Sequence, residues 1–277
     1  MPTVHTTKRP FSSPHRLLGK LFSGVLSLFL VVGPGLPSIS QAAEIRVVTS
    51  GGFSAAYDLL IPLYEQATGH TVVTSRGASI GNAPDSIPSR LARGEQFDVV
   101  ILADSALDTL STQDQVQKGS RVDLARSMIG MSVRKDTSKP DISNVEALKQ
   151  TLLNAKSIAY SASASGTYLS NELFPRLGIA DQIKDKAKKI YSERVGAVVL
   201  RGDAEIGFQQ VSELLPFKEL EFVGPLPDEV QQRVFFSAGV ATATRAPEVA
   251  RHLIRFLAAP AAAPIVRSTG MEPSATQ

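Results

Sequence analysis

The strongest constraint on the fold is an alternation of strand-like and helix-like segments that begins at residue 44. The segment EIRVVTS (44–50) alternates, turns apolar and breaks at Gly51-Gly52, as a strand entering a tight turn does. The next segment repeats apolar residues every four positions and stops at a glycine, which is typical of a helix. Two further repeats of this order predict a parallel sheet covered by helices, an α/β fold. The expected strands are 44–50, 70–76 and 98–104, and the expected helices are 54–69, 85–94 and 105–116.

The rest of the chain continues in the same style. Short apolar segments predict strands, and longer periodic segments predict helices, the last of them interrupted by Pro260 and Pro264. Nothing after the N-terminal leader approaches the ~20 apolar residues that a membrane span needs. The expected strands are 127–136, 157–161, 188–192, 205–213 and 234–242, and the expected helices are 144–155, 167–178, 194–204 and 246–270.

The N-terminus has the three-part layout of a secretory signal peptide. Residues 1–20 carry four basic residues and no acid, residues 21–33 are uncharged and apolar, and small residues precede Ala42. We therefore expect residues 1–42 to be cleaved off, with an uncleaved signal anchor as the alternative. The exported chain would lie in the periplasm.

The charge balance of the mature chain gives no evidence for nucleic-acid binding. The leader removes four of the 29 basic residues, which leaves 25 against 26 acidic ones, so the chain is near neutral. The absence of cysteine excludes disulfides, thiolate metal sites and cysteine catalysis. The four histidines are too scattered for a metal site, and no phosphate-binding glycine motif occurs, so we expect no metal and no cofactor.

Several predicted strands end in turns of small residues that lead into helices. Ligands bind outside the carboxyl ends of parallel strands, and a helix N-terminus there offers free N–H groups and partial positive charge. The turns TSGGFS, RGAS and SASASGTY are therefore candidate walls of one anion pocket. The alternative is that these serines and glycines are ordinary helix caps.

A serine hydrolase is a separate hypothesis. The segment GASIG (77–81) follows a predicted strand and fits the G-x-S-x-G pattern, with Ser79 as nucleophile. Such a serine needs a histidine base, and the only later histidine, His252, lies inside a predicted helix.

The order of the motifs resembles a known family. The relevant segments are TSGGFSAAYDLLIPLYEQATGHTVVTS, then RGAS, RLARGEQFDVVILAD, SIAYSASASGTYLSNELFPRLGI, VVLRGDAEIGFQQ and the C-terminal helices. In this order they resemble the periplasmic substrate-binding proteins of ABC transporters, specifically the molybdate-binding-like group. The resemblance spans essentially the whole mature chain.

This resemblance implies a two-lobed type II periplasmic binding protein fold. Each lobe would be a mostly parallel sheet flanked by helices, and two crossover strands near 122–134 and 232–240 would join the lobes. Hinge closure would bury a ligand in the inter-lobe cleft. Lobe one would comprise residues 43–125 plus 233–277, and lobe two residues 126–232.

The resemblance also implies the site. The ligand serines of the family fall near Ser50, Ser79 and Ser165, and Gln210 stands where molybdate binders commonly have a tyrosine. Two arginines lie beside the predicted cleft turns, and a bidentate arginine is a frequent carboxylate partner. The full expected ligand-binding set is Ser50, Gly51, Gly52, Phe53, Arg76, Gly77, Ala78, Ser79, Ser163, Ser165, Gly166, Thr167, Tyr168, Ser192, Arg194 and Gln210.

We therefore expect a periplasmic solute-binding protein of an ABC importer that captures a molybdate- or tungstate-like oxyanion and is not an enzyme. One alternative ligand is a small organic acid, and the alternative enzyme is the hydrolase using Ser79. A sensor or adhesin module also stays open. The expected partners are the small anion and a transporter permease, without nucleic acid or membrane insertion, and the chain is expected to be a monomer.

Overall fold

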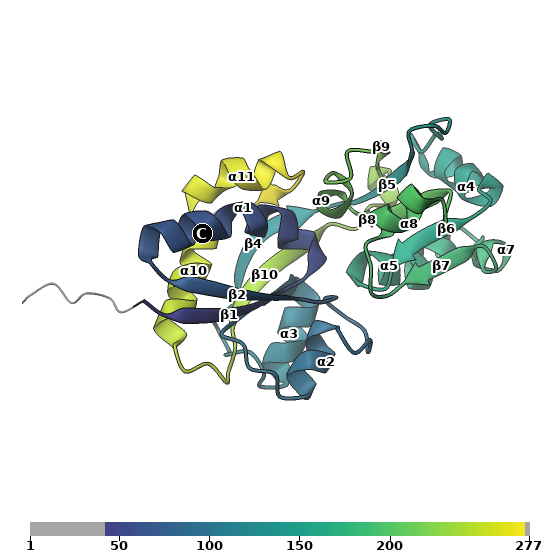
Figure 1. Ribbon diagram of the computed structural model, residues 1–277. Coiled ribbons are helices and arrows are strands. Elements are labelled where there is room, and N and C mark those ends of the chain that lie inside the picture. The colour runs from purple at the N-terminus through teal and green to yellow at the C-terminus, as the bar shows by residue number, and fades with distance from the viewer. Residues whose placement is uncertain (1–41, 275–277) are drawn as a thin grey trace, which may run out of the picture. The chain divides into compact units, whose positions relative to one another are not determined.

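The computed structural model describes residues 42–274 (Figure 1). The expected signal peptide therefore lies almost wholly outside the described residues. The described residues belong to one compact unit, so the division into two lobes with the boundaries given above stays a prediction. No single helix in the described part of the chain combines the length and apolar composition needed to cross a bilayer.

The first of two sheets has six strands in the order β11-β4-β10-β3-β1-β2. β1 pairs in parallel with β2 and β3, whereas β10 runs antiparallel to β3 and β4. The parallel pairs are those that the repeated strand–helix order predicts. The strands are β1 (Glu44–Thr49), β2 (Thr71–Arg76), β3 (Val99–Ala103), β4 (Val122–Ser127), β10 (Val234–Val240) and β11 (Glu272–Pro273).

Helices cover both faces of this sheet, and because successive side chains of a strand point to opposite faces, its strands contribute to two separate cores. Ile45 and Val47 pack with α1, α10 and α11, whereas Val48 packs on the other side with α2 and α3. Figure 1 shows α1 and α11 above the sheet and α2 and α3 below it. The helices are α1 (Gly51–Thr68), α2 (Ile87–Ala92), α3 (Asp104–Thr112), α10 (Pro247–Ala258) and α11 (Ala263–Ser268), with a 3-10 turn at Pro260–Ala262.

The second sheet has five strands in the order β7-β6-β8-β5-β9. β6 is parallel to β7 and β8, and β5 is antiparallel to β8 and β9. Ile158 packs with α4 on one face, and Ala159 packs with α8 on the other. The elements are β5 (Ile129–Arg134), α4 (Val145–Asn154), β6 (Ile158–Ser161), α5 (Ala164–Tyr168), a π-helical turn (Leu169–Leu173), α6 (Phe174–Arg176), α7 (Ala180–Ile183), β7 (Ala187–Ile190), α8 (Val195–Arg201), β8 (Ile206–Gln210), α9 (Val211–Leu214), β9 (Leu220–Pro225) and a 3-10 turn (Asp228–Val230).

The expected fold class is confirmed, with two crossings of the chain between the sheets. The first joins β4 to β5 through Met128, and the second joins β9 to β10. The expectation that each sheet is mostly parallel was wrong: both sheets are mixed, because the strands next to the crossings pair antiparallel.

Three local expectations were wrong. The expected strand 205–213 ends at Gln210, and the next four residues form α9, where the Val211 N–H donates to the Met128 carbonyl (2.9 Å). The helix expected from residue 54 begins at Gly51. β9 was not expected, because it has no clear apolar alternation. β4 was expected only as part of the crossover strand near 122–134, because Asp123 and Arg126 interrupt its own apolar pattern.

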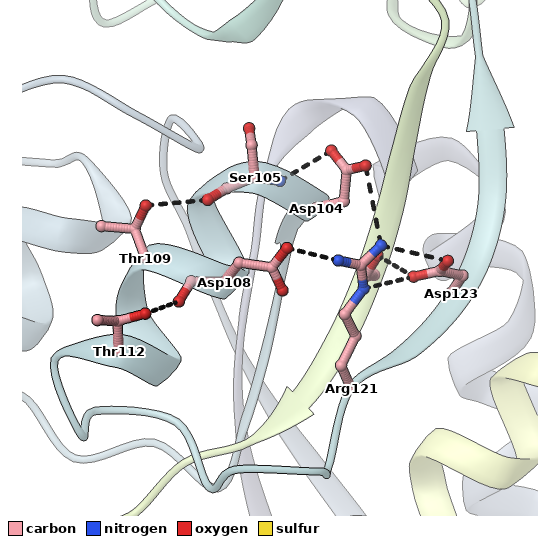
Figure 2. A network of polar contacts seen from close by, with 8 residues as sticks. Asp104, Ser105, Asp108, Thr109, Thr112, Arg121 and Asp123 are labelled. Atoms are coloured by element: carbon pink, nitrogen blue, oxygen red, sulfur yellow. Dashed lines mark hydrogen bonds and ion pairs between the residues drawn. The ribbon is translucent and has the colours of Figure 1, made fainter.

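A cluster of charged side chains holds the N-terminal half of α3 against the first sheet (Figure 2). The Arg121 guanidinium donates to Asp108 (2.7 Å) and Asp123 (2.8 Å) and lies 3.8 Å from Asp104. Asp123 also accepts from the Ser237 hydroxyl (2.6 Å), which links the cluster to β10. Burial raises the pKa of Asp123, but the hydrogen bonds from Arg121 and Ser237 outweigh it and hold that pKa below its ordinary value.

Replacing Arg121 with methionine should lower the free energy of unfolding by about 1–2 kcal/mol, because three carboxylates lose their shared counter-charge. The loss should shrink at high salt, which screens the remaining repulsion. Urea unfolding at low and high salt measures both effects. Lys118→Met is the matched control: its pair with Asp114 is mostly exposed (74% and 76%), and it should change stability by less than about 0.5 kcal/mol. Equal effects of the two substitutions would contradict a network.

Candidate functional site

A cavity of about 240 Å³ lies where turns from both sheets meet. Its size is below the roughly 300–1,000 Å³ of pockets for drug-sized ligands, which suits a small solute. The turns that follow β1, β2, β6, β7 and β8 all contribute. The lining residues are Gly51, Gly52, Ser54, Arg76, Gly77, Ala78, Ser79, Asp85, Ser161, Ala162, Ser163, Ala164, Ser165, Ile190, Tyr191, Ser192, Glu193, Arg194, Gln209, Gln210, Glu213 and Phe236.

The N-terminus of α1 forms one wall. Gly51 and Gly52 are the first residues of this 18-residue helix, whose first N–H groups have no partner within the helix. Gly52 has no room for a side chain, since a Cβ would overlap the Phe236 ring. The wall is therefore bare backbone with the partial positive charge of a helix N-terminus.

The last residue of β2 carries a positive side chain, and the turn after it holds a structural serine. Arg76 donates to Ser54 Oγ (2.9 Å) and to Asp58 (2.5 Å), and its side chain is 47% exposed. The Ser79 hydroxyl accepts from the Ala103 N–H (3.0 Å), and the Ser79 N–H donates to Ser163 Oγ (3.1 Å). The second bond joins a turn of the first sheet directly to a turn of the second.

Ser79 has no histidine beside it in the described part of the chain. The rings of His70 and His252 lie 6.0 Å and 5.6 Å from the ring of Tyr64, outside the cavity. A nucleophilic serine requires a base within hydrogen-bond reach, so the geometry gives the hydrolase hypothesis no support.

The cavity brings most of the expected ligand-binding residues together. Those that line it are Gly51, Gly52, Arg76, Gly77, Ala78, Ser79, Ser163, Ser165, Ser192, Arg194 and Gln210. Ligand binding by them stays a prediction. Those outside the lining are Ser50, Phe53, Gly166, Thr167 and Tyr168.

The residues outside the lining have other roles. Phe53 is fully buried in the core, and the Tyr168 hydroxyl donates to the Val230 carbonyl (2.8 Å). Gly166 allows α5 to start close to β6, because a Cβ there would overlap the Ser161 carbonyl oxygen. The Thr167 N–H donates to the Ser163 carbonyl (3.0 Å) within α5. The Ser50 N–H donates to Ile101, and its hydroxyl is buried without a partner.

The site prediction missed a buried carboxyl. Glu213 is only 9% exposed and lines the cavity from α9. Gln209 donates to its Oε1 (2.8 Å) while accepting from the Val195 N–H (3.0 Å). The carboxyl lies against α1, where a Cβ on Gly51 would overlap Oε1. The signal in the sequence was an acid inside the apolar run VSELL.

Burial raises the pKa of Glu213 to about 7, although the charge of Arg194 and the bond from Gln209 act in the opposite direction. The carboxyl can therefore accept or release a proton near neutral pH. The remaining lining residues that were not expected are Ser54, Asp85, Ser161, Ala162, Ala164, Ile190, Tyr191, Glu193, Gln209 and Phe236.

Gln210 presents unused polar atoms at the cavity. Its side chain is 2% exposed, and both amide atoms are buried without a hydrogen-bond partner. An unpaired buried amide is unfavourable, so a ligand that bonds to it would gain affinity.

The raised pKa of Glu213 should make the protein less stable as pH rises. Below pH ~4.5 the carboxyl is protonated in both states, and between ~4.5 and ~7 only the unfolded state releases its proton. Stability from this group is therefore present at low pH and is lost by pH ~7. Relative to wild type, Glu213→Gln should gain up to about 3 kcal/mol between pH ~4 and ~8.

Urea unfolding of both proteins across this pH range measures the difference. Glu221→Gln, the same change on the surface of β9, is the matched control and should track the wild type. A difference between Glu213→Gln and wild type that stays constant with pH would mean that the carboxyl ionises as readily in the folded state as in the unfolded one.

Comparison with known proteins adds a family and several relatives. The family model described as "Bacterial extracellular solute-binding protein" matches residues 45–272. A protein from Pseudomonas sp. named "Aconitate isomerase" is 43% identical over 252 residues, which cover 91% of this chain and 96% of that protein. "Molybdate-binding protein ModA" of Azotobacter vinelandii is 25% identical over 250 residues, covering 88% of this chain and 96% of that protein.

Solved structures share the fold. The periplasmic molybdate-binding protein of Azotobacter vinelandii matches with a TM-score of 0.67 at 21% identity, covering 84% of this chain and 100% of that one. The sulfate-binding protein SubI of Mycobacterium tuberculosis matches with a TM-score of 0.67 at 19% identity, covering 84% and 87%.

One expectation is overturned by these relatives. We expected a protein that is not an enzyme, but a protein 43% identical over nearly the whole chain is named as an isomerase. A binding-protein fold thus does not exclude catalysis, because function depends on the site and not on the fold.

Proposed function

The chain belongs to the bacterial extracellular solute-binding protein family, and we propose that its cavity binds aconitate and interconverts the cis and trans isomers. The observation that carries this proposal is the 43% identity to a protein named "Aconitate isomerase" over 91% of the chain. Aconitate is a small organic acid, a propene that bears three carboxylates.

The polar groups of the cavity support a polycarboxylate. Arg76 at the end of β2 and Arg194 at the N-cap of α8 both line it. Guanidinium groups bind carboxylates through paired N–H donors, so each arginine suits one end of the solute. The unpartnered amide of Gln210 and the N-terminus of α1 supply further donors.

Binding of a molybdate-like oxyanion is the second candidate. It is favoured by the 25% identity to ModA and by the hydroxyl-rich turn Ser161–Ser165. A compact oxyanion can be held by neutral donors alone. The two arginines, and a glutamine at the position of the common tyrosine, favour a carboxylate instead.

The setting follows from the family. Solute-binding proteins of this family deliver ligands to ABC transporter permeases. We propose that the chain lies in the periplasm after removal of residues 1–42 and that a permease is its protein partner.

Proton NMR of cis- or trans-aconitate incubated with the purified chain tests the activity against a protein-free blank. Calorimetry with trans-aconitate, molybdate, tungstate and sulfate tests the ligand. We expect interconversion, and heat with the tricarboxylate. Heat with molybdate alone and no interconversion would favour the oxyanion and overturn the isomerase.

Replacing Arg194 with alanine should weaken trans-aconitate binding tenfold to hundredfold, or about 1.4–2.7 kcal/mol, because one carboxylate loses a charged donor. Arg251→Ala is the matched control, since Arg251 lies on α10, outside the cavity lining, and pairs with Glu248. It should bind as the wild type does. Unchanged affinity in Arg194→Ala would remove Arg194 from the proposed site.

A further inference from the structure

We propose that Glu213 is the catalytic residue that carries the proton during this isomerisation. The inference rests on the proposed function and deepens it, since nothing in the family match or in the relatives' names assigns a role to this side chain. It stands on the position of the carboxyl, on the other groups around the cavity, and on the chemistry of the double bond.

Cis–trans interconversion requires a group that lowers the barrier to rotation about the carbon–carbon double bond. One route adds a nucleophile across the bond, most readily a thiolate, but the chain has no cysteine. The other route moves the double bond. The methylene of aconitate lies next to both a carboxylate and the alkene, so its C–H bond is the acidic one.

The proton shift balances without a co-reactant. The Glu213 carboxylate takes a proton from the methylene: the C–H bond breaks, an O–H bond forms, and the electron pair spreads over three carbons and the carboxylates. Glu213 then returns the proton to the former alkene carbon at the opposite end. The new double bond joins the central carbon to the former methylene carbon. Whether it is cis or trans depends on the torsion angle at which the enzyme held that single bond. No atom is gained or lost, and the carboxylate is regenerated.

Glu213 is the one suitable base among the titratable groups that line the cavity. These groups are Arg76, Asp85, Tyr191, Glu193, Arg194 and Glu213. Asp85 and Tyr191 are exposed, and Glu193 is held by Arg201 through two contacts of 2.7 and 3.0 Å. Glu213 alone among the acids is buried in the wall.

The surroundings of Glu213 suit proton transfer. Gln209 fixes one carboxylate oxygen and is itself fixed by the Val195 N–H, so the base is held in place by two successive hydrogen bonds. Burial raises its pKa to about 7, and a base is most effective when its pKa lies near the working pH. Arg194 and the N-terminus of α1 are placed to stabilise the charge that develops on the substrate.

Glu213→Gln tests the proposal because it keeps the shape of the side chain and removes the base. We expect kcat for aconitate interconversion to fall at least hundredfold. Binding of propane-1,2,3-tricarboxylate, a saturated analogue that cannot isomerise, should be retained or tightened when measured by calorimetry. Glu221→Gln is the matched control on the surface of β9 and should leave both quantities unchanged.

The outcomes separate the two proposals. A wild type that neither binds nor interconverts aconitate overturns the proposed function and the role of Glu213 together. An active wild type with an equally active Glu213→Gln overturns the role of Glu213 alone. Parallel loss of analogue binding and of activity would also overturn it, because the residue would then only hold the pocket together.

Two measurements on the wild type test the proposal independently of the variant. The rate at limiting substrate should rise with pH as a single group near pH ~7 loses its proton. In D₂O, product and recovered substrate should gain deuterium at the two outer carbons of the propene and nowhere else. A rate that is independent of pH from ~5 to ~8, or interconversion without any C–H exchange and without transfer between these carbons, would overturn proton transfer by this group.

Discussion

The site depends on the direct contact between α1 and α9. The Ser212 hydroxyl donates to the Gly52 carbonyl (2.6 Å), and the next side chain, Glu213, lies against Gly51. This approach requires a glycine at position 51, because a Cβ there would overlap Glu213, whereas Gly52 is required by the Phe236 ring of β10. A helix that starts in this way exposes its N–H groups to the cavity and brings the buried carboxyl to the same wall. The contact therefore assembles the site from a helix of each sheet.

Much of the fold could be predicted from the sequence, because the repeated strand–helix order has direct physical causes. A central strand of the parallel half is buried on both faces and so carries a continuous apolar run, as Val99–Ala103 does. The edge strand Thr71–Arg76 is less buried and was identifiable from its place in the strand–helix order. Where a strand is partly exposed and lies next to a crossing, as β4 does, charged residues interrupt its apolar pattern, and the strand was expected from the family resemblance and not from that pattern. Gln210 ends β8 because the chain turns toward Met128, which is a tertiary constraint absent from local sequence.

The candidate site could also be predicted only in part. Backbone-rich turns such as Gly77–Ser79 were identifiable, because small residues after a strand indicate close approach of a ligand. Glu213 was not, because the segment containing it was taken for a strand and because its environment comes from α1, more than a hundred and fifty positions earlier in the chain. Phe236 and Tyr191 line the cavity for the same reason: distant segments bring them there.

The hydroxyl of Ser163 accepts a hydrogen bond that links the turns of the two sheets, and it therefore does not cap its own helix, α5. Ser163 stands at the N-cap of α5 with extended backbone, yet it makes no capping bond, because its oxygen accepts from the Ser79 N–H instead. If the turns separate, this oxygen becomes free to cap α5, and a local bond replaces the long-range one. Part of the free energy lost on separation would thus be regained inside the second sheet's own helix. The loss of the hydrogen bond between Ser79 and Ser163 would therefore cost less free energy than the bond itself contributes. A solute could then leave the cavity more easily.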